Sequence, residues 1–113
     1  MTFNAFDVVV VPFPFTDKTT TRRRPALILS DARAFNLQVG QAVMAMITSA
    51  KNSDWPLDIE IRDLDAAGLP SPSMIRMKLF TLDEKLILRK AGKLADPDRE
   101  RVINALRRLF PFT

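Results

Sequence analysis

The amino-acid sequence predicts a mainly β fold, a small antiparallel barrel with one α-helix at its C-terminal end. Short segments with strand-like patterning recur along most of the chain, and only the last stretch has apolar residues at helical spacing. An open sheet of such short strands would leave exposed edges, so a barrel is favoured. At 113 residues, the chain is expected to form a single domain over residues 1–113.

The strands are predicted from apolar runs and from period-two alternation. The run VVVV at Val8–Val11, followed by Pro12 and Pro14, indicates a strand buried on both faces. Further strands are predicted at Ala26–Leu29, Val43–Ile47, Leu57–Ile61, Ile75–Leu79 and, as a short strand, within Leu86–Leu94. Because alternate residues of a strand point to opposite faces, Arg76 and Lys78 are expected to project outward.

Polar segments connect the predicted strands. Phe13–Arg24 is predicted to be a basic loop, and a polar connection runs through Asp31 and Asn36 to Gly40. A turn is expected around residues 68–70, and a turn or one helical turn at Thr81–Lys85.

The last element is predicted to be a helix that closes one face of the sheet. Asp96 is the expected capping residue, and Pro97 the first helical position. The predicted apolar stripe consists of Val102, Ile103, Leu106, Leu109 and Phe110.

Composition excludes several kinds of site. The chain has no cysteine, which excludes a disulfide framework and thiolate-bound zinc, and it has no histidine, the commonest metal ligand. The lack of histidine also excludes Ser-His and Cys-His catalysis. We therefore expect no metal and no cofactor, and an enzyme of this composition has to act with Arg, Lys, Thr, Ser, Asp or Glu.

Charge and hydropathy indicate the setting in which the protein acts. The formal net charge of +4 favours a polyanionic partner or an acidic protein. No apolar run is long enough to span a bilayer, and the first residues lack the pattern of a signal peptide. A cytoplasmic location without membrane contact is expected.

Three arginines that precede Pro25 are the first candidate functional residues. Pro25 favours an extended conformation of Arg24, and a guanidinium held at the start of a strand suits a phosphate. Arg22 and Arg23 are candidates for binding a nucleic-acid backbone. The alternative is a solvated basic loop without function.

Hydroxyl groups directly after a strand are the second candidate. Thr48 and Ser49 follow the strand Val43–Ile47, where a hydroxyl either donates to a phosphate oxygen or completes a turn.

Five further residues are weaker candidates. Asp17 and Lys18 lie in the basic loop. Arg76 and Lys78 either line a groove for RNA or form the solvent-exposed face of their strand. Trp55, the only tryptophan, either stacks on a base or covers the edge of the core.

Four blocks of the sequence together resemble one protein family, in the order that the family has them. They are VVVVPFPFT (Val8–Thr16), RRRPALILS (Arg22–Ser30), MITS (Met46–Ser49) and PSMIRMKLFTLD (Pro72–Asp83). In these blocks the chain resembles the MazF/PemK toxins. It departs from them at Phe6, where the family commonly has Gly, and at Ala50, where a polar residue is frequent.

The resemblance implies an SH3-like barrel of the CcdB/MazF type, usually a homodimer, acting as the toxin of a type II toxin–antitoxin system. It implies sequence-specific, metal-independent cleavage of single-stranded RNA, chiefly mRNA, and neutralisation by a cognate antitoxin. The resemblance also implies that the toxin binds operator DNA only indirectly, through the antitoxin. The family's catalytic Arg and Thr correspond to Arg24 and Thr48.

The chemistry implied is attack of a ribose 2′-hydroxyl on the adjacent phosphate, which leaves a 2′,3′-cyclic phosphate and a 5′-hydroxyl. Arg24 is expected to stabilise the charge that develops, and Thr48 to hold a non-bridging oxygen. Asp17 is a candidate for orienting the guanidinium or accepting the proton.

Two functions of other classes stay open at this point. A non-enzymatic toxin on the same scaffold, as in the related CcdB family, binds DNA gyrase. An inactive barrel would serve only as a nucleic-acid or antitoxin binding module. Detection of 5′-hydroxyl ends after incubation with long RNA separates cleavage from both.

Overall fold

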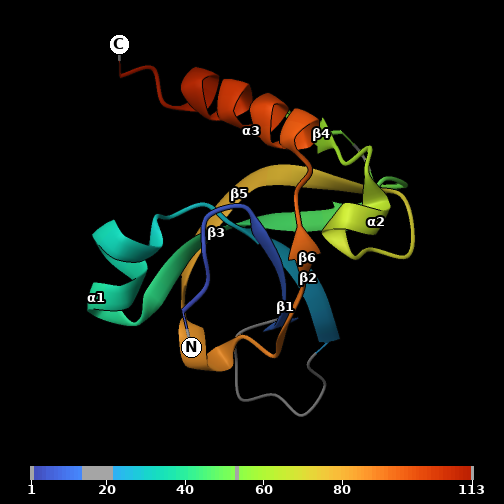
Figure 1. Cartoon of the computed structure of the whole chain (residues 1–113). Coiled ribbons are helices and arrows are strands. Elements are labelled where there is room, and N and C mark those ends of the chain that lie inside the picture. The colour runs from blue at the N-terminus through green and yellow to red at the C-terminus, as the bar shows by residue number, and fades with distance from the viewer. Residues whose placement is uncertain (1, 14–21, 53, 113) are drawn as a thin grey trace.

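The centre of the molecule is a curled antiparallel sheet. The computed structural model describes residues 2–13, 22–52 and 54–112, and within them the sheet has six strands in the order β4-β5-β3-β2-β1-β6. The strands are β1 (Asp7–Phe13), β2 (Arg22–Ile28), β3 (Gln41–Ser49), β4 (Ile59–Glu60), β5 (Ser73–Asp83) and β6 (Arg89–Lys93). Helix α3 (Asp96–Leu109) lies across the curled sheet (Figure 1). The predicted fold class, mainly β with a C-terminal helix, is confirmed.

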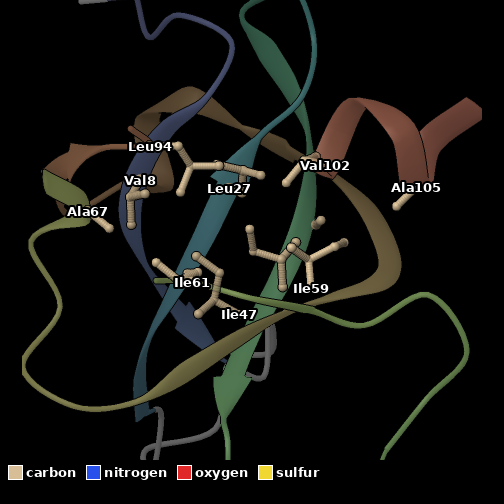
Figure 2. Packing of buried hydrophobic residues seen from close by; sticks show 11 residues of the cluster. Val8, Leu27, Ile47, Ile59, Ile61, Ala67, Leu94, Val102 and Ala105 are labelled. Atoms are coloured by element: carbon tan, nitrogen blue, oxygen red, sulfur yellow. The ribbon is translucent and has the colours of Figure 1, made fainter. Parts of the chain in front are cut away.

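Apolar side chains are buried on both faces of the sheet. The first face is covered by α3, whose Val102 and Ala105 pack with strand residues that include Val8, Leu27, Ile47 and Ile59 (Figure 2). The second face has its own cluster, which includes Val9, Val11, Ala26, Ile28 and Met44. The prediction that the valine run is buried on both faces is therefore confirmed.

The first turn of α3 is anchored by a different aspartate from the one predicted. Ala95 is the capping residue and Asp96 is already helical, so the prediction of an Asp96 cap is wrong. The buried carboxylate of Asp98 instead accepts the backbone N–H groups of Arg62 and Asp63, at 3.2 and 3.0 Å. These bonds tie the helix to the segment after β4.

The apolar stripe of α3 agrees in part with the prediction. Val102 and Leu106 pack against the first face, whereas Phe110 lies beyond the helix and its side chain is 42% exposed. No helix of the described residues is long and apolar enough to cross a membrane.

Short helical segments connect the strands. They are η1 (Ala32–Asn36), which continues into α1 (Leu37–Val39), α2 (Leu64–Ala67) and η2 (Glu84–Leu86). The sequence did not predict η1 and α1. The Asp31 carboxylate caps this segment by accepting the Ala34 N–H at 2.7 Å, and Gly40, with a φ of 70°, ends it.

The predicted loop Phe13–Arg24 is wrong at both ends. Phe13 belongs to β1 and Arg22–Arg24 to β2, with Phe13 paired to Arg22. Pro12 is tolerated inside β1 because β6 pairs with β1 only as far as Val10, so no strand needs a Pro12 N–H on that side. Asp17 and Lys18 lie outside the described residues.

The other strands differ from prediction mainly in length. β4 covers only Ile59–Glu60, and Leu57 before it has a φ of 68°, which is incompatible with a regular strand. β5 runs to Asp83, so the expected helical turn follows at Glu84–Leu86. The pairing of β5 with β3 shifts between Ala45 and Met46, which face Leu79 and Arg76 respectively.

Candidate active site

An open depression of about 350 Å³ lies where the ends of β2 and β3 meet the segment that precedes β5. It brings together residues that the sequence singled out separately, namely Arg22, Arg23, Arg24, Thr48 and Ser49. Among the described residues, no carboxylate lines it. The depression therefore combines cations and hydroxyls, which suit a phosphodiester, with apolar side chains such as Ile47 and Leu69.

Pro25 explains why the strands separate at this point. The β2–β3 pairing ends at Ala26 opposite Met46, and Pro25 has no N–H to continue it. Arg24 lies two residues before Ala26 on β2, and Thr48 lies two residues after Met46 on β3. Both residues line the depression, which lies beyond the last paired residues of β2 and β3.

Arg24 is held by the sheet and has hydrogen-bonding capacity to spare. It pairs with Val11 on β1, and its guanidinium carbon lies 5.6 Å from the centre of the Phe13 ring. The Nε atom of Arg24 is buried and meets no hydrogen-bond acceptor within the described parts of the chain. A buried N–H without an acceptor is unfavourable, and a phosphate oxygen would satisfy it.

Thr48 is fixed by the turn that follows β3. The N–H of Asn52 donates to the carbonyl of Ser49 at 3.0 Å, and Lys51 N–H donates to the Ser49 hydroxyl at 3.2 Å. This turn places the Asn52 amide so that its Nδ2 donates to Thr48 Oγ1. Because a hydroxyl has one proton, and Asn52 occupies an acceptor position, the Thr48 proton is left for another partner.

Arg76 lies outside this depression. Its Nε and Nη2 donate to Asp58 Oδ1 and Oδ2 at 3.3 and 3.0 Å, and the side chains of Arg76 and Asp58 are 11% and 8% exposed. The expectation that Arg76 projects into solvent is therefore wrong. The partner is Asp58, which directly precedes β4 and whose side chain is at least as buried as that of Arg76.

Trp55 packs with both cations of β5. The Arg76 guanidinium carbon lies 5.2 Å from the centre of its ring, and Lys78 Nζ lies 5.9 Å from it. The indole is still 42% exposed. Trp55 thus does not cover the main core, and it forms a second cluster with Asp58, Arg76 and Lys78, which we term the tryptophan cluster.

Sequence reasoning missed Asn52 and Asp58. Nothing in the local pattern distinguishes Asn52 from an ordinary turn residue, because its role depends on a bond back to Thr48. Asp58 pairs with a residue of another strand, so only the β4–β5 register reveals it. Among the described residues, no group of three or more Asp or Glu side chains is arranged to hold a metal ion.

Comparison with known proteins gives two results. The family model described as "PemK-like, MazF-like toxin of type II toxin-antitoxin system" matches residues 4–110, whereas no curated protein sequence matches the chain. Similar solved structures include a MazE–MazF complex from Deinococcus radiodurans, 22% identical with a TM-score of 0.77, covering 100% of both chains.

Two mycobacterial structures are also similar. The Mycobacterium tuberculosis toxin MazF-mt6 is 18% identical with a TM-score of 0.72, and the match covers 95% of this chain and 98% of that one. An endoribonuclease in complex with its cognate antitoxin, from a mycobacterial species, is 15% identical with a TM-score of 0.75, covering 99% and 96%. At these identities the solved structures establish the fold, while the family model covers nearly the whole chain. The chain belongs to the PemK-like, MazF-like toxin family of type II toxin–antitoxin systems.

Proposed function

We propose that this protein is an endoribonuclease that cleaves single-stranded RNA at the Arg24–Thr48 depression, without a metal ion. The observation that carries the proposal is the buried Nε of Arg24, which lacks an acceptor among the described residues and shares a depression with the Thr48 hydroxyl. Membership of the toxin family and the fold shared with a mycobacterial endoribonuclease support the same activity.

The chemistry follows from which groups line the depression. The ribose 2′-oxygen attacks the neighbouring phosphorus and gives up its proton to solvent water, while the bond to the 5′-oxygen breaks and this oxygen takes up a proton from solvent. The products carry a 2′,3′-cyclic phosphate and a 5′-hydroxyl. Negative charge grows on the non-bridging oxygens as the new bond forms. Arg24 donates to these oxygens through a planar, permanently charged group, and Thr48 donates the proton that Asn52 leaves available.

The remaining cations have a supporting role in this proposal. Arg22 and Arg23 are exposed at the rim of the depression, where they attract the RNA backbone and make binding weaken as salt rises. Ser49 lies beside Thr48 in the same depression, and its hydroxyl accepts the Lys51 N–H. Ser49 therefore keeps its proton for a second phosphate contact.

The family also supports partners for this activity. We propose that the protein acts in the cytoplasm as a homodimer and is neutralised by a cognate antitoxin, as the MazE–MazF complexes of similar structure suggest. Co-expression with the neighbouring open reading frame, followed by co-purification and light scattering, tests both the partner and the stoichiometry.

Cleavage itself is tested with purified protein, a long natural RNA and EDTA. We expect fragments with 5′-hydroxyl and 2′,3′-cyclic phosphate ends. Thr48→Val keeps the shape of the β-branched side chain but removes the hydroxyl, and its cleavage rate should fall about 100-fold, the effect of losing one transition-state donor. Activity that strictly requires magnesium contradicts the metal-independent mechanism. Full activity of Thr48→Val contradicts the assignment of the Arg24–Thr48 depression as the active site. Growth arrest without RNA cleavage favours gyrase binding or a pure binding module instead.

A further inference from the structure

Trp55 is an exposed aromatic side chain on a segment that is held in place. It is the only tryptophan of the chain, and 42% of its surface is exposed. The backbone N–H of Trp55 donates to Asp58 Oδ2 at 2.9 Å, and the backbone N–H of Asp58 donates back to the Trp55 carbonyl at 3.2 Å. These two bonds close a tight turn, so the backbone that carries the indole has little freedom.

The tryptophan cluster also fixes the ring. Arg76 lies against it at 5.2 Å and is itself anchored by two bonds to Asp58, while Lys78 approaches at 5.9 Å. A ligand that meets an already ordered side chain avoids the entropy cost of ordering it. The exposed part of the indole is thus a preorganised apolar surface bordered by cations.

This surface lies next to the proposed active site. In the pairing of β3 with β5, Thr48 faces Met74 and Arg76 faces Met46, which makes Thr48 and Arg76 diagonal neighbours on one sheet face. Such neighbours are about 7–8 Å apart. The turn that leads to Trp55 also contacts Thr48 through Asn52. A phosphate bound at Thr48 would therefore have Arg76 of the tryptophan cluster as a diagonal neighbour of its binding residue.

We propose that Trp55 is a nucleobase-binding site, on which a base adjoining the scissile phosphate stacks. The inference rests on the proposed function, because it assigns a position to the substrate of that same site. Every base has a π-face, so stacking adds affinity with little sequence preference. The charges fit a nucleotide, since Asp58 is neutralised by Arg76, whereas exposed Lys78 forms no ion pair among the described residues and can meet the phosphate of the stacked nucleotide.

The composition of the chain makes this proposal directly measurable. With one tryptophan and no tyrosine, the intrinsic fluorescence of the protein reports on Trp55 alone. The probe is a short oligoribonucleotide of mixed sequence, 2′-O-methylated throughout so that it is not cleaved. Its binding is followed independently by the anisotropy of an end label. We expect quenching of Trp55 that saturates together with the anisotropy, and binding without quenching for the same backbone with abasic sites.

The outcomes separate this inference from the function on which it rests. Saturable binding of the intact oligonucleotide that leaves Trp55 emission unchanged overturns the nucleobase site, even when the protein cleaves RNA. Equal quenching by the abasic backbone overturns it too, because the change would then report only charge or a rearrangement. A protein that quenches with RNA but yields no cleavage products overturns the proposed activity and leaves the nucleobase site standing.

Variants give a second measurement. Trp55→Leu should raise the KM for RNA cleavage about 5- to 150-fold, the range for loss of one base–aromatic stack, and leave kcat nearly unchanged. Trp55→Phe retains an aromatic ring, and its KM should lie between those of Trp55→Leu and the unsubstituted protein. Phe112→Ala, at a side chain 87% exposed beyond α3, is the matched control and should behave as the unsubstituted protein. An unchanged KM in a folded Trp55→Leu protein contradicts the proposal, and if that variant does not fold, Trp55→Phe and the fluorescence titration decide.

Discussion

Arg24 and Arg76 lie on the same face of one sheet and have opposite surroundings. The guanidinium of Arg76 gives two hydrogen bonds to Asp58 and packs on Trp55, whereas the buried Nε of Arg24 meets no acceptor within the described residues. Both side chains have an aromatic ring nearby, Phe13 in the case of Arg24. The difference is therefore the acceptor that Arg76 has in Asp58 and that the Nε of Arg24 lacks among the described residues.

This difference distinguishes an arginine used for structure from one available for chemistry. The buried Arg76–Asp58 ion pair ties β5 to the segment before β4, and removal of one partner leaves an uncompensated charge. An arginine without a protein acceptor contributes less to folding, and its donors stay available for a substrate oxygen. Sequence alone treated both residues as cations that could bind RNA.

The largest effect is expected for the substitution of Arg24 by Ala. The rate of RNA cleavage should fall by about 100- to 1000-fold, as for loss of one charged transition-state donor. The melting temperature should change little, because no acceptor in the described part of the chain loses its donor. Arg24→Lys is the control: it keeps the charge but not the planar fork, and should recover only part of the rate. Cleavage assays and thermal melts of the same preparations check both statements.

The next effect concerns stability. Arg76→Ala leaves the 8% exposed carboxylate of Asp58 without its cation, and should lower the free energy of unfolding by about 3 kcal/mol. Denaturant titration measures this. In a double-mutant cycle with Asp58→Ala, the two losses should not add, since each substitution removes the same pair. Additive losses would contradict the structural role of the pair.

The smallest effect is expected at Asn52. Asn52→Asp exchanges the donor beside Thr48 for a carboxylate that accepts the Thr48 proton, so kcat should fall about 10-fold while KM stays nearly constant. The kcat of Asn52→Ala should fall less, because this substitution removes the donor without adding a competing acceptor. The effect of Asn52→Asp should vanish in a Thr48→Val background, and its persistence there would argue against a bond between the two side chains.

Patterns within one segment predicted most of the fold. The valine run of β1, the alternation of β5 and the helical spacing from Val102 onward each depend only on near neighbours in sequence. The failures lie where a distant contact decides. Arg22–Arg24 become strand because Val11–Phe13 pair with them, and Asp96 is not the cap because Ala95 takes that position and Asp98 bonds to Arg62 and Asp63.

The candidate site shows the same limit. Arg24, Thr48 and Ser49 were singled out because each stands at a strand end or beside Pro25, and the structure brings them into one depression. The acceptor that removes Arg76 from the site is Asp58, 18 residues earlier in the sequence and directly after Leu57 with its positive φ. No local pattern reports that pairing, so the two arginines could be told apart only in three dimensions.

The central claim is that Arg24 acts in catalysis and Arg76 in folding. The most direct test measures RNA cleavage and melting temperature for Arg24→Ala and Arg76→Ala side by side, below the melting point of both. We expect Arg24→Ala to melt like the unsubstituted protein and cleave almost no RNA. We expect Arg76→Ala to melt early and to keep a kcat within a few-fold of normal at saturating RNA, while its KM rises because Trp55 loses a packing partner. An Arg24→Ala protein that keeps its cleavage rate, or a folded Arg76→Ala protein that loses it, would contradict the account.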